Sequence, residues 1–166
     1  MTVKVVNWNS EEYWSGIELR NKLLKTSAGK EWIKNLPLDE EKDIHLAAMI
    51  DGKVVGTLLL SKKSQTTAQI KQVAISDSYQ GFGLGKKLLK FAEKIAELLD
   101  FQSVYLTGRK QAWGFYDHFG YQSIGYAYSD GQVILKKFEK KLYTNKGIGK
   151  FGIIKYITLR EMETNG

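Results

Sequence analysis

Three glycines at alternate positions stand between an apolar stretch and a helical pattern. Residues 73–75 are apolar, Gly81, Gly83 and Gly85 follow, and two lysines then open a long amphipathic segment. A strand, a glycine turn and a helix N-terminus direct unpaired backbone N–H groups at one place, where the helix dipole adds partial positive charge. Glycine also lets the backbone approach a bulky phosphate, because it has no Cβ atom. The stretch therefore predicts a site for a phosphorylated cofactor.

The two lysines, Lys86 and Lys87, have an unusual position for cations. They fall in the first helical turn, where the helix dipole disfavours positive charge by some tenths of a kcal/mol each. A bound anion would reverse the sign of that effect. The alternative is that both side chains are solvated and that the small penalty is tolerated.

Other reactive side chains are scarce. The 166 residues contain no cysteine, so disulfide and thiol chemistry are excluded. The two histidines, His45 and His118, lie far apart and without metal-ligand spacing, so we expect no metal site. No apolar run approaches 18 residues and the N-terminus lacks a signal-peptide pattern, so we expect a cytoplasmic protein that does not bind a membrane.

A net charge of +7 raises the alternative of a nucleic-acid partner. The lysines are spread along the chain, and apolar residues interrupt the densest group, residues 136–155. A positive potential favours a polyanionic cofactor equally well. We therefore expect no nucleic-acid partner, and steeply salt-dependent DNA retention would contradict this expectation.

The pattern of apolar and turn residues predicts one domain of alternating strands and helices. Expected strands cover residues 3–8, 45–50, 54–60, 67–75, 103–107, 121–128 and 133–138, and expected helices begin at residue 10 and cover 31–35, 83–99 and 111–118. Asp51-Gly52 between two apolar runs predicts a hairpin with a type I′ turn. A helix between residues 75 and 103 makes the strands on either side of it parallel.

The strand expected at 67–75 contains an irregularity. Ala68 and Ile70 are apolar at even positions, whereas Val73 and Ile75 are apolar at odd positions. Because side chains alternate across a strand, one extra residue near 71–72, a β-bulge, would restore a single buried face. The alternative is a strand covered on both faces, where the phase carries no information.

Three motifs in order carry a resemblance to a known family. Gln80-Gly-Phe-Gly-Leu-Gly85 matches the pattern Gln/Arg-x-x-Gly-x-Gly/Ala, residues 112–121 match Ala-x-x-Phe-Tyr-x-x-x-Gly-Phe with a final Tyr, and residues 45–56 look like a strand hairpin. Together they resemble the GNAT superfamily of acetyl-CoA-dependent N-acetyltransferases. A dinucleotide-binding fingerprint is excluded, because the glycines follow an antiparallel meander, and a P-loop is excluded because no Gly-Lys-Ser/Thr is present.

The resemblance implies a mixed α/β (α+β) fold. Its sheet of six or seven mainly antiparallel strands would be flanked by about four helices and would contain a splayed central strand pair. The resemblance covers residues 1–142. Residues 143–166 would form a C-terminal extension, with 153–159 as a possible extra strand.

The resemblance also implies where acetyl-CoA would bind. Residues 81–86 would hold the pyrophosphate, and exposed backbone of the preceding strand would pair with the pantetheine arm. The cofactor-binding residues expected on this basis are Val73, Ala74, Ile75, Gln80, Gly81, Phe82, Gly83, Leu84, Gly85 and Lys86.

Catalysis would rest on Tyr116, which matches the tyrosine of the second motif. As general acid, its hydroxyl would protonate the departing thiolate. The family often places a glutamate base on the strand at 67–75, but that strand has no carboxylate here, and we name no base. Aromatic residues expected to line the acceptor pocket are Trp14, Trp32, Tyr126 and Tyr128.

The function that follows is transfer of an acetyl group to a primary amine by direct attack, without a covalent enzyme intermediate. The acceptor would be a small molecule or a protein or peptide amine, and the protein a monomer or homodimer. Because the carboxylate is missing, a non-catalytic acyl-CoA-binding or sensory module on the same scaffold is the alternative.

Overall fold

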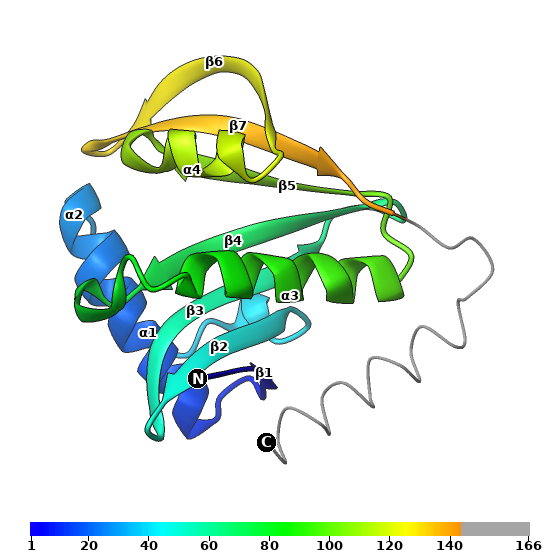
Figure 1. Cartoon of the computed structure of the whole chain (residues 1–166). Coiled ribbons are helices and arrows are strands. Elements are labelled where there is room, and N and C mark those ends of the chain that lie inside the picture. The colour runs from blue at the N-terminus through cyan, green and yellow to red at the C-terminus, as the bar shows by residue number, and fades with distance from the viewer. Residues whose placement is uncertain (144–166) are drawn as a thin grey trace.

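The structure is a computed structural model, and it describes residues 1–143 (Figure 1). Its strands are β1 (Thr2–Val6), β2 (Ile44–Ile50), β3 (Lys53–Lys62), β4 (Thr67–Ile75), β5 (Ser103–Arg109), β6 (Gln122–Asp130) and β7 (Val133–Lys141). Its helices are α1 (Glu11–Arg20), α2 (Thr26–Ala28), α3 (Leu84–Leu98) and α4 (Trp113–His118), with a π-helical turn η1 (Asn21–Lys25) and 3-10 turns η2 (Leu38–Glu40), η3 (Asp77–Tyr79) and η4 (Lys110–Ala112). The extension predicted for 143–166 lies, apart from Tyr143, outside the described residues.

All seven strands form one sheet in the order β1-β2-β3-β4-β5-β7-β6. Every neighbouring pair is antiparallel except β4 and β5, which are parallel because α3 connects them. The predicted mixed, mainly antiparallel sheet with about four helices is confirmed. The β2–β3 hairpin has positive φ at both Asp51 (50°) and Gly52 (75°), as a type I′ turn requires.

The parallel pair separates soon after it begins. Pairing between β4 and β5 is confined to Thr67–Gln69 and Ser103–Tyr105. Beyond these residues the two strands diverge, and Figure 1 shows the part that contains β5, β6 and β7 angled away from the part that contains β1 to β4. This is the splayed central strand pair that the sequence predicted.

A β-bulge bends β4 where the strands diverge. Leu59 pairs with Lys71 and Thr57 pairs with Ala74, so two residues of β4 oppose one residue of β3. Gln72, one of these two, has a φ of 58°. The predicted bulge is therefore confirmed, and the strand changes its apolar phase there because of the extra residue.

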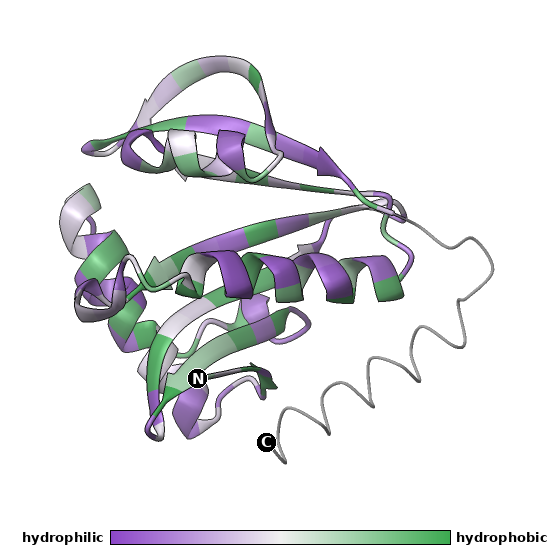
Figure 2. Cartoon of the chain, viewed as in Figure 1, coloured by the Kyte–Doolittle hydropathy of each residue, from purple (hydrophilic) through white to green (hydrophobic). Residues whose placement is uncertain are grey.

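Helices cover opposite faces of the sheet. A Cβ atom on Gly56 would lie 3.0 Å from the Leu88 side chain of α3, whereas the side chain of Thr57 lies against Gly16 of α1. Neighbouring residues of a strand point to opposite faces, so α3 and α1 lie on different sides of β3. Figure 2 shows hydrophobic and hydrophilic residues alternating along α3, whose buried stripe includes Leu84, Leu88, Ala92 and Ile95.

The helix predicted at residues 31–35 is wrong. The segment is not helical, and its backbone at Ile33 pairs with the side chain of Asn21, which accepts from the Ile33 N–H (2.7 Å) and donates to its carbonyl (3.1 Å). The helical part of this region lies earlier, because α1 continues through η1 and α2 and ends at Gly29, whose φ is 70°. A tertiary contact thus replaces the local helical preference.

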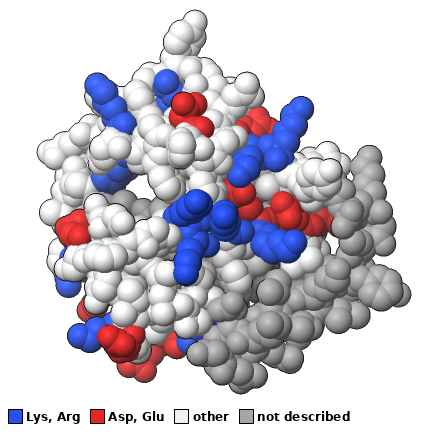
Figure 3. All heavy atoms as spheres, viewed as in Figure 1, with Lys and Arg blue, Asp and Glu red and all other residues white. Residues whose placement is uncertain are grey.

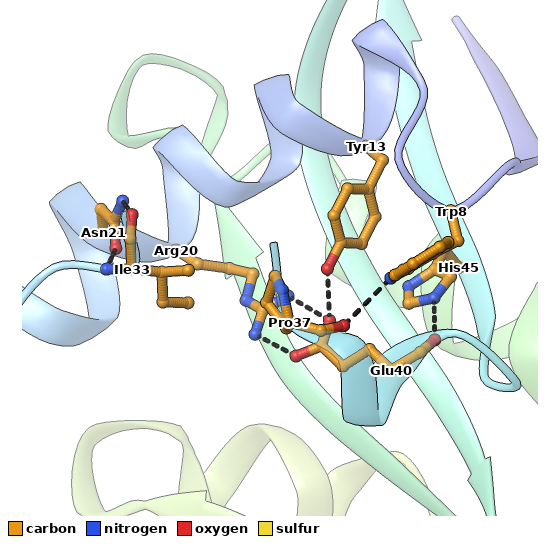
Figure 4. A network of polar contacts seen from close by, with 8 residues as sticks. All are labelled: Trp8, Tyr13, Arg20, Asn21, Ile33, Pro37, Glu40 and His45. Carbon is orange, nitrogen blue, oxygen red and sulfur yellow. Dashed lines mark hydrogen bonds and ion pairs between the residues drawn. The ribbon is translucent and has the colours of Figure 1, made fainter. Parts of the chain in front are cut away.

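A buried polar network holds the segment around η2, which precedes β2, against α1 (Figure 4). Glu40 accepts hydrogen bonds from the Tyr13 hydroxyl (2.8 Å) and from both terminal nitrogens of Arg20 (2.9 and 2.7 Å). A ring nitrogen of His45 lies 2.8 Å from the Glu40 carbonyl. All four side chains are buried, so this bidentate ion pair holds α1 in place from inside the protein.

Candidate active site

A cavity of about 860 Å³ opens where β4 and β5 diverge. It is lined by the second half of β4, the loop that leads to α3, the first turn of α3, β5, α4 and the segment around α2. On the α3 side, Figure 3 shows a hollow in the surface and a group of Lys and Arg side chains over α3. Every cofactor-binding residue predicted from the sequence lines this cavity except Phe82, which is 72% exposed.

The N-terminus of α3 faces the cavity without a cap. Among residues 1–143, no side chain caps the helix, and its first hydrogen bond runs from the Lys87 N–H to the Gly83 carbonyl (3.1 Å). The N–H groups of the residues before Lys87 therefore have no carbonyl partner within the helix. Gly81 (φ 87°) and Gly83 (φ 78°) have positive φ, and no atom of the described part of the chain lies within 4 Å of the position where either Cβ would stand. Space and donors at this terminus fit an anionic group such as a phosphate.

Gln80 closes the loop that precedes this terminus. Its side-chain amide donates to the Ile75 carbonyl (3.2 Å) and to the Asp77 carboxylate (3.0 Å). The two hydrogen bonds connect the end of β4 to the glycine turn. Gln80, the first residue of the predicted motif, thus fixes the conformation of the loop, whereas the glycines leave space beside the helix N-terminus.

The edge of β4 provides a second set of polar groups. In the described part of the chain, residues 70–75 have no pairing partner on the β5 side. Alternate backbone N–H and C=O groups of a strand point to each neighbour, so this edge retains hydrogen-bonding capacity toward the cavity. An extended amide-containing chain fits such an edge in the manner of an added strand.

Tyr116 of α4 lines the same cavity. Its ring lies close to those of Phe115, Tyr121 and Phe138, and it packs over Gly108, where a Cβ atom would stand only 2.8 Å from it. The side chain is 6% exposed, and burial raises the pKa of its hydroxyl to about 12. The hydroxyl therefore carries its proton at neutral pH, and burial makes it a weaker acid than an exposed tyrosine.

Four aromatic residues predicted for the acceptor pocket do not line the cavity. Trp14 donates to the side chain of Asn9 (2.9 Å), and Trp32 donates to that of Thr26 (2.9 Å). Tyr126 and Tyr128 lie on β6 and are 95% and 47% exposed. The structure thus brings the predicted cofactor residues and Tyr116 together, but not these four.

Several charged residues of the cavity were missed by the sequence reasoning. Arg109 of β5 donates to the Leu24 carbonyl (2.8 Å) and to the Ser27 hydroxyl, which joins β5 to the region of α2. Lys30 and Asp130 form an ion pair (2.8 Å) between residues 100 positions apart. The alternation of side chains along β5 places Thr107 and Arg109 on the face opposite Gly108. This alternation could have identified Arg109 from the sequence as a residue of the other cavity wall.

The split sheet and the uncapped helix at the split define an α/β domain of the acyltransferase type. The chain belongs to the acetyltransferase (GNAT) family, whose model matches residues 5–121. None of the described helices has the length and apolarity needed to cross a membrane.

Known proteins resemble the chain in sequence and in fold. A Bacillus subtilis (strain 168) protein named "putative acetyltransferase" is 32% identical over 79 residues, and this match spans 48% of the chain and about half (53%) of that relative. Among solved structures, an acetyltransferase of the GNAT family from Staphylococcus aureus Mu50 superposes with a TM-score of 0.69 (18% identity, 85% of this chain and 99% of that one). An aminoglycoside 6′-N-acetyltransferase complexed with coenzyme A superposes with a TM-score of 0.72 (13% identity, 87% and 99%). At such identities the structures show a shared fold.

Proposed function

We propose that this protein transfers an acetyl group from acetyl-CoA to a primary amine by direct attack within a ternary complex. One observation carries the proposal. A single cavity brings together an uncapped helix N-terminus, an unpaired strand edge and a buried, protonated tyrosine hydroxyl. Membership of the acetyltransferase family and the fold of the coenzyme A complex support it.

The proposed role of each part follows from its chemistry. Backbone N–H groups of residues 81–86 would hold the pyrophosphate, and Lys86 would add positive charge. The free edge of β4 at residues 73–75 would pair with the amide groups of the pantetheine arm, which leads the thioester toward the bulge at Gln72. Acetyl-CoA supplies the activated acyl group, while the protein binds, orients and shields it from water.

Tyr116 would complete the reaction by moving one proton. When the amine attacks the thioester carbonyl, the C–S bond breaks and the sulfur leaves as a thiolate. The tyrosine O–H would donate a proton to that sulfur as general acid. The Tyr116 side chain is fixed for this task by its aromatic neighbours and by the absence of a side chain at Gly108.

One observation favours the non-catalytic alternative, an acyl-CoA-binding module. The lining of the cavity includes no carboxylate on β4. Asp77, which follows β4, accepts a hydrogen bond from Gln80, and the Asp130 carboxylate is paired with Lys30. The proposal does not require a protein base if the acceptor binds as the free amine, because an attacking neutral amine loses its proton to water afterwards.

Thiol release from acetyl-CoA tests the proposal. With a panel of primary amines, we expect amine-dependent release of free coenzyme A thiol and a matching N-acetylated product by mass spectrometry. Coenzyme A binding, measured by calorimetry, separates the alternatives. Binding without release for every amine favours the non-catalytic module, and neither binding nor release contradicts both.

A further inference from the structure

The cavity has two sides, because neighbouring residues of β4 and β5 point to opposite faces. Gly108 faces Tyr116 and α4, so Thr107 and Arg109 face the other side. Arg109 confirms this direction through its hydrogen bonds to Leu24 and Ser27. The cofactor elements, α3 and Tyr116, lie on the first side. An acceptor amine therefore has to approach from the second side, which the α1–α2 region borders.

The second side carries an excess of positive charge. Lys25 of η1, Lys71 of β4 and Arg109 of β5 line it. Within residues 1–143, none of these three cations forms an ion pair with a carboxylate. The carboxylate of Asp130 is the acidic group on this side of the lining, and Lys30 neutralises it at 2.8 Å.

Arg109 is the most constrained of these cations. Its guanidinium donates to an uncharged carbonyl and an uncharged hydroxyl. Burial lowers the pKa of Arg109, and no acidic neighbour among the described residues counteracts this effect. A partly buried guanidinium with only neutral partners attracts an anion, since the Coulomb energy of a pair increases as the surroundings become less polar.

The coenzyme does not account for these charges. The phosphate site proposed above lies at the N-terminus of α3, where Lys86 is available. Lys71 and Arg109 lie on β4 and β5 and face the α1 side of the sheet rather than α3. Arg109 is hydrogen-bonded to Leu24 there. Apolar side chains from Leu23, Leu24 and Leu135 border the same space.

We infer that the acceptor is a primary amine that also carries an anionic group, a carboxylate or a phosphate, and that polycationic amines are poor acceptors. This inference rests on the proposed function for the transfer step, but it also predicts binding without transfer. The anionic group would contact Lys71 and Arg109, and the apolar residues would contact the body of the molecule. The positive charge that this anionic group leaves unneutralised lowers the pKa of the bound amine, which favours its neutral, nucleophilic form.

Matched pairs of amines test the inference. L-leucine and L-leucinamide differ in the carboxylate, and O-phosphoethanolamine and ethanolamine differ in the phosphate; spermidine serves as the polycation. Binding to the protein saturated with coenzyme A is followed by NMR titration, and kcat/KM for thiol release is corrected to the free amine. We expect the anionic member of at least one pair to be preferred by about tenfold or more in binding and in transfer, and spermidine to be the poorest acceptor.

Charge variants show whether the cavity causes this preference. Lys71→Gln should reduce the ratio between anionic and neutral members about five- to tenfold, and Lys25→Gln should reduce it by a smaller factor. Lys53→Gln, at an exposed position on the β2–β3 hairpin, removes the same charge away from the cavity and should leave the ratio unchanged. A purely structural role of Lys71 would change both members of a pair equally.

The outcomes are distinct. Equal binding of both members, no binding of either, or better binding of spermidine overturns the inference. Equal loss of preference in Lys53→Gln also overturns it, because the effect would then be a property of the whole surface. A preference in binding that depends on Lys71, without thiol release, supports the inferred ligand class and contradicts the transferase function instead.

Discussion

Replacement of Tyr116 by Phe removes one oxygen atom from the centre of the candidate site. The ring remains packed by Phe115, Tyr121 and Phe138, since a phenyl group has the same contacts. Within the described residues, no hydrogen bond links the Tyr116 hydroxyl to another group, and burial is the sole cause of its raised pKa. The variant should therefore fold normally, with a free energy of unfolding within about 1 kcal/mol of the parent protein.

The protonation state of the hydroxyl sets the pH range over which it can act as an acid. The difference between the ordinary pKa of 10.0 and about 12 corresponds to about 3 kcal/mol by which burial disfavours the phenolate. The hydroxyl is thus fully protonated from pH 6 to 10 and available as an acid throughout. Loss of a positioned general acid typically lowers a rate by about 10²–10⁴-fold, so kcat of Tyr116→Phe should fall by at least about a hundredfold.

The assay compares three quantities in the parent and variant proteins. Amine-dependent thiol release gives kcat, calorimetry gives the affinity for coenzyme A, and urea unfolding gives stability. We expect kcat to fall while coenzyme A affinity changes less than about threefold. Phe119→Leu, a change in a partly buried ring at the end of the same helix that does not line the cavity, serves as the control for altered packing.

Two results would refute this reasoning. An unchanged kcat at an unchanged affinity removes Tyr116 from the proton transfer. A loss of activity of the parent protein near pH 9 that disappears in Tyr116→Phe would show that the hydroxyl ionises well below pH 12, contrary to the burial argument.

Three further predictions concern the glycine turn and the buried network. Gly83→Val should weaken coenzyme A binding by tenfold or more, because a branched side chain at a φ of 78° distorts the turn and occupies the open space; Gly52→Val, at a φ of 75° in the β2–β3 hairpin, imposes similar strain and should leave that affinity unchanged. Glu40→Ala should lower the free energy of unfolding in urea by about 3–5 kcal/mol, since it leaves the Arg20 charge buried without a partner. Glu18→Ala, at an exposed position of α1, is the control and should lower it by less than about 1 kcal/mol. A similar loss of stability in both variants would contradict the role of the network. The free energy of unfolding should also decrease in two stages as the pH is lowered. Burial holds the pKa of His45 below 6.5, so below that pH the unfolded chain binds a proton before the folded protein does and stability decreases. Burial raises the pKa of Glu40, but the hydrogen bonds and charge of Arg20 outweigh burial and hold this pKa below 4.5, so a second decrease in stability should begin near pH 4.5. Urea unfolding between pH 3 and 8 measures both stages, and a flat profile would contradict them.

Local sequence patterns predicted most of the sheet and its irregularities. The phase change between Ile70 and Val73 predicted the bulge, and Asp51-Gly52 predicted a turn whose residues both have positive φ. These features depend on the alternation of side chains and on the backbone freedom of glycine, which act over a few residues. The helix predicted at 31–35 failed because its backbone at Ile33 pairs with the distant side chain of Asn21.

The cofactor part of the candidate site was predictable because its residues are nearly contiguous. Gln80, Gly83 and Gly85 stand within six positions, and Tyr116 belongs to a second short motif. The cavity walls that face α2 were not predictable, since they combine residues from η1, β4, β5 and β6. The aromatic residues predicted for that role lie elsewhere, which indicates that residue type alone does not identify a wall.

From its sequence alone, the chain determines a glycine turn at the start of a helix, a bulged strand before it and the identity of the family that these motifs indicate. Only the tertiary structure decides that Arg109 reaches across to Leu24 and that Lys30 pairs with Asp130, so that unpaired cations border the second side of the cavity. The physical reason is distance along the chain. Turns and bulges are set by the conformational preferences of neighbouring residues, whereas the charge of a cavity is the sum over side chains that folding alone brings together.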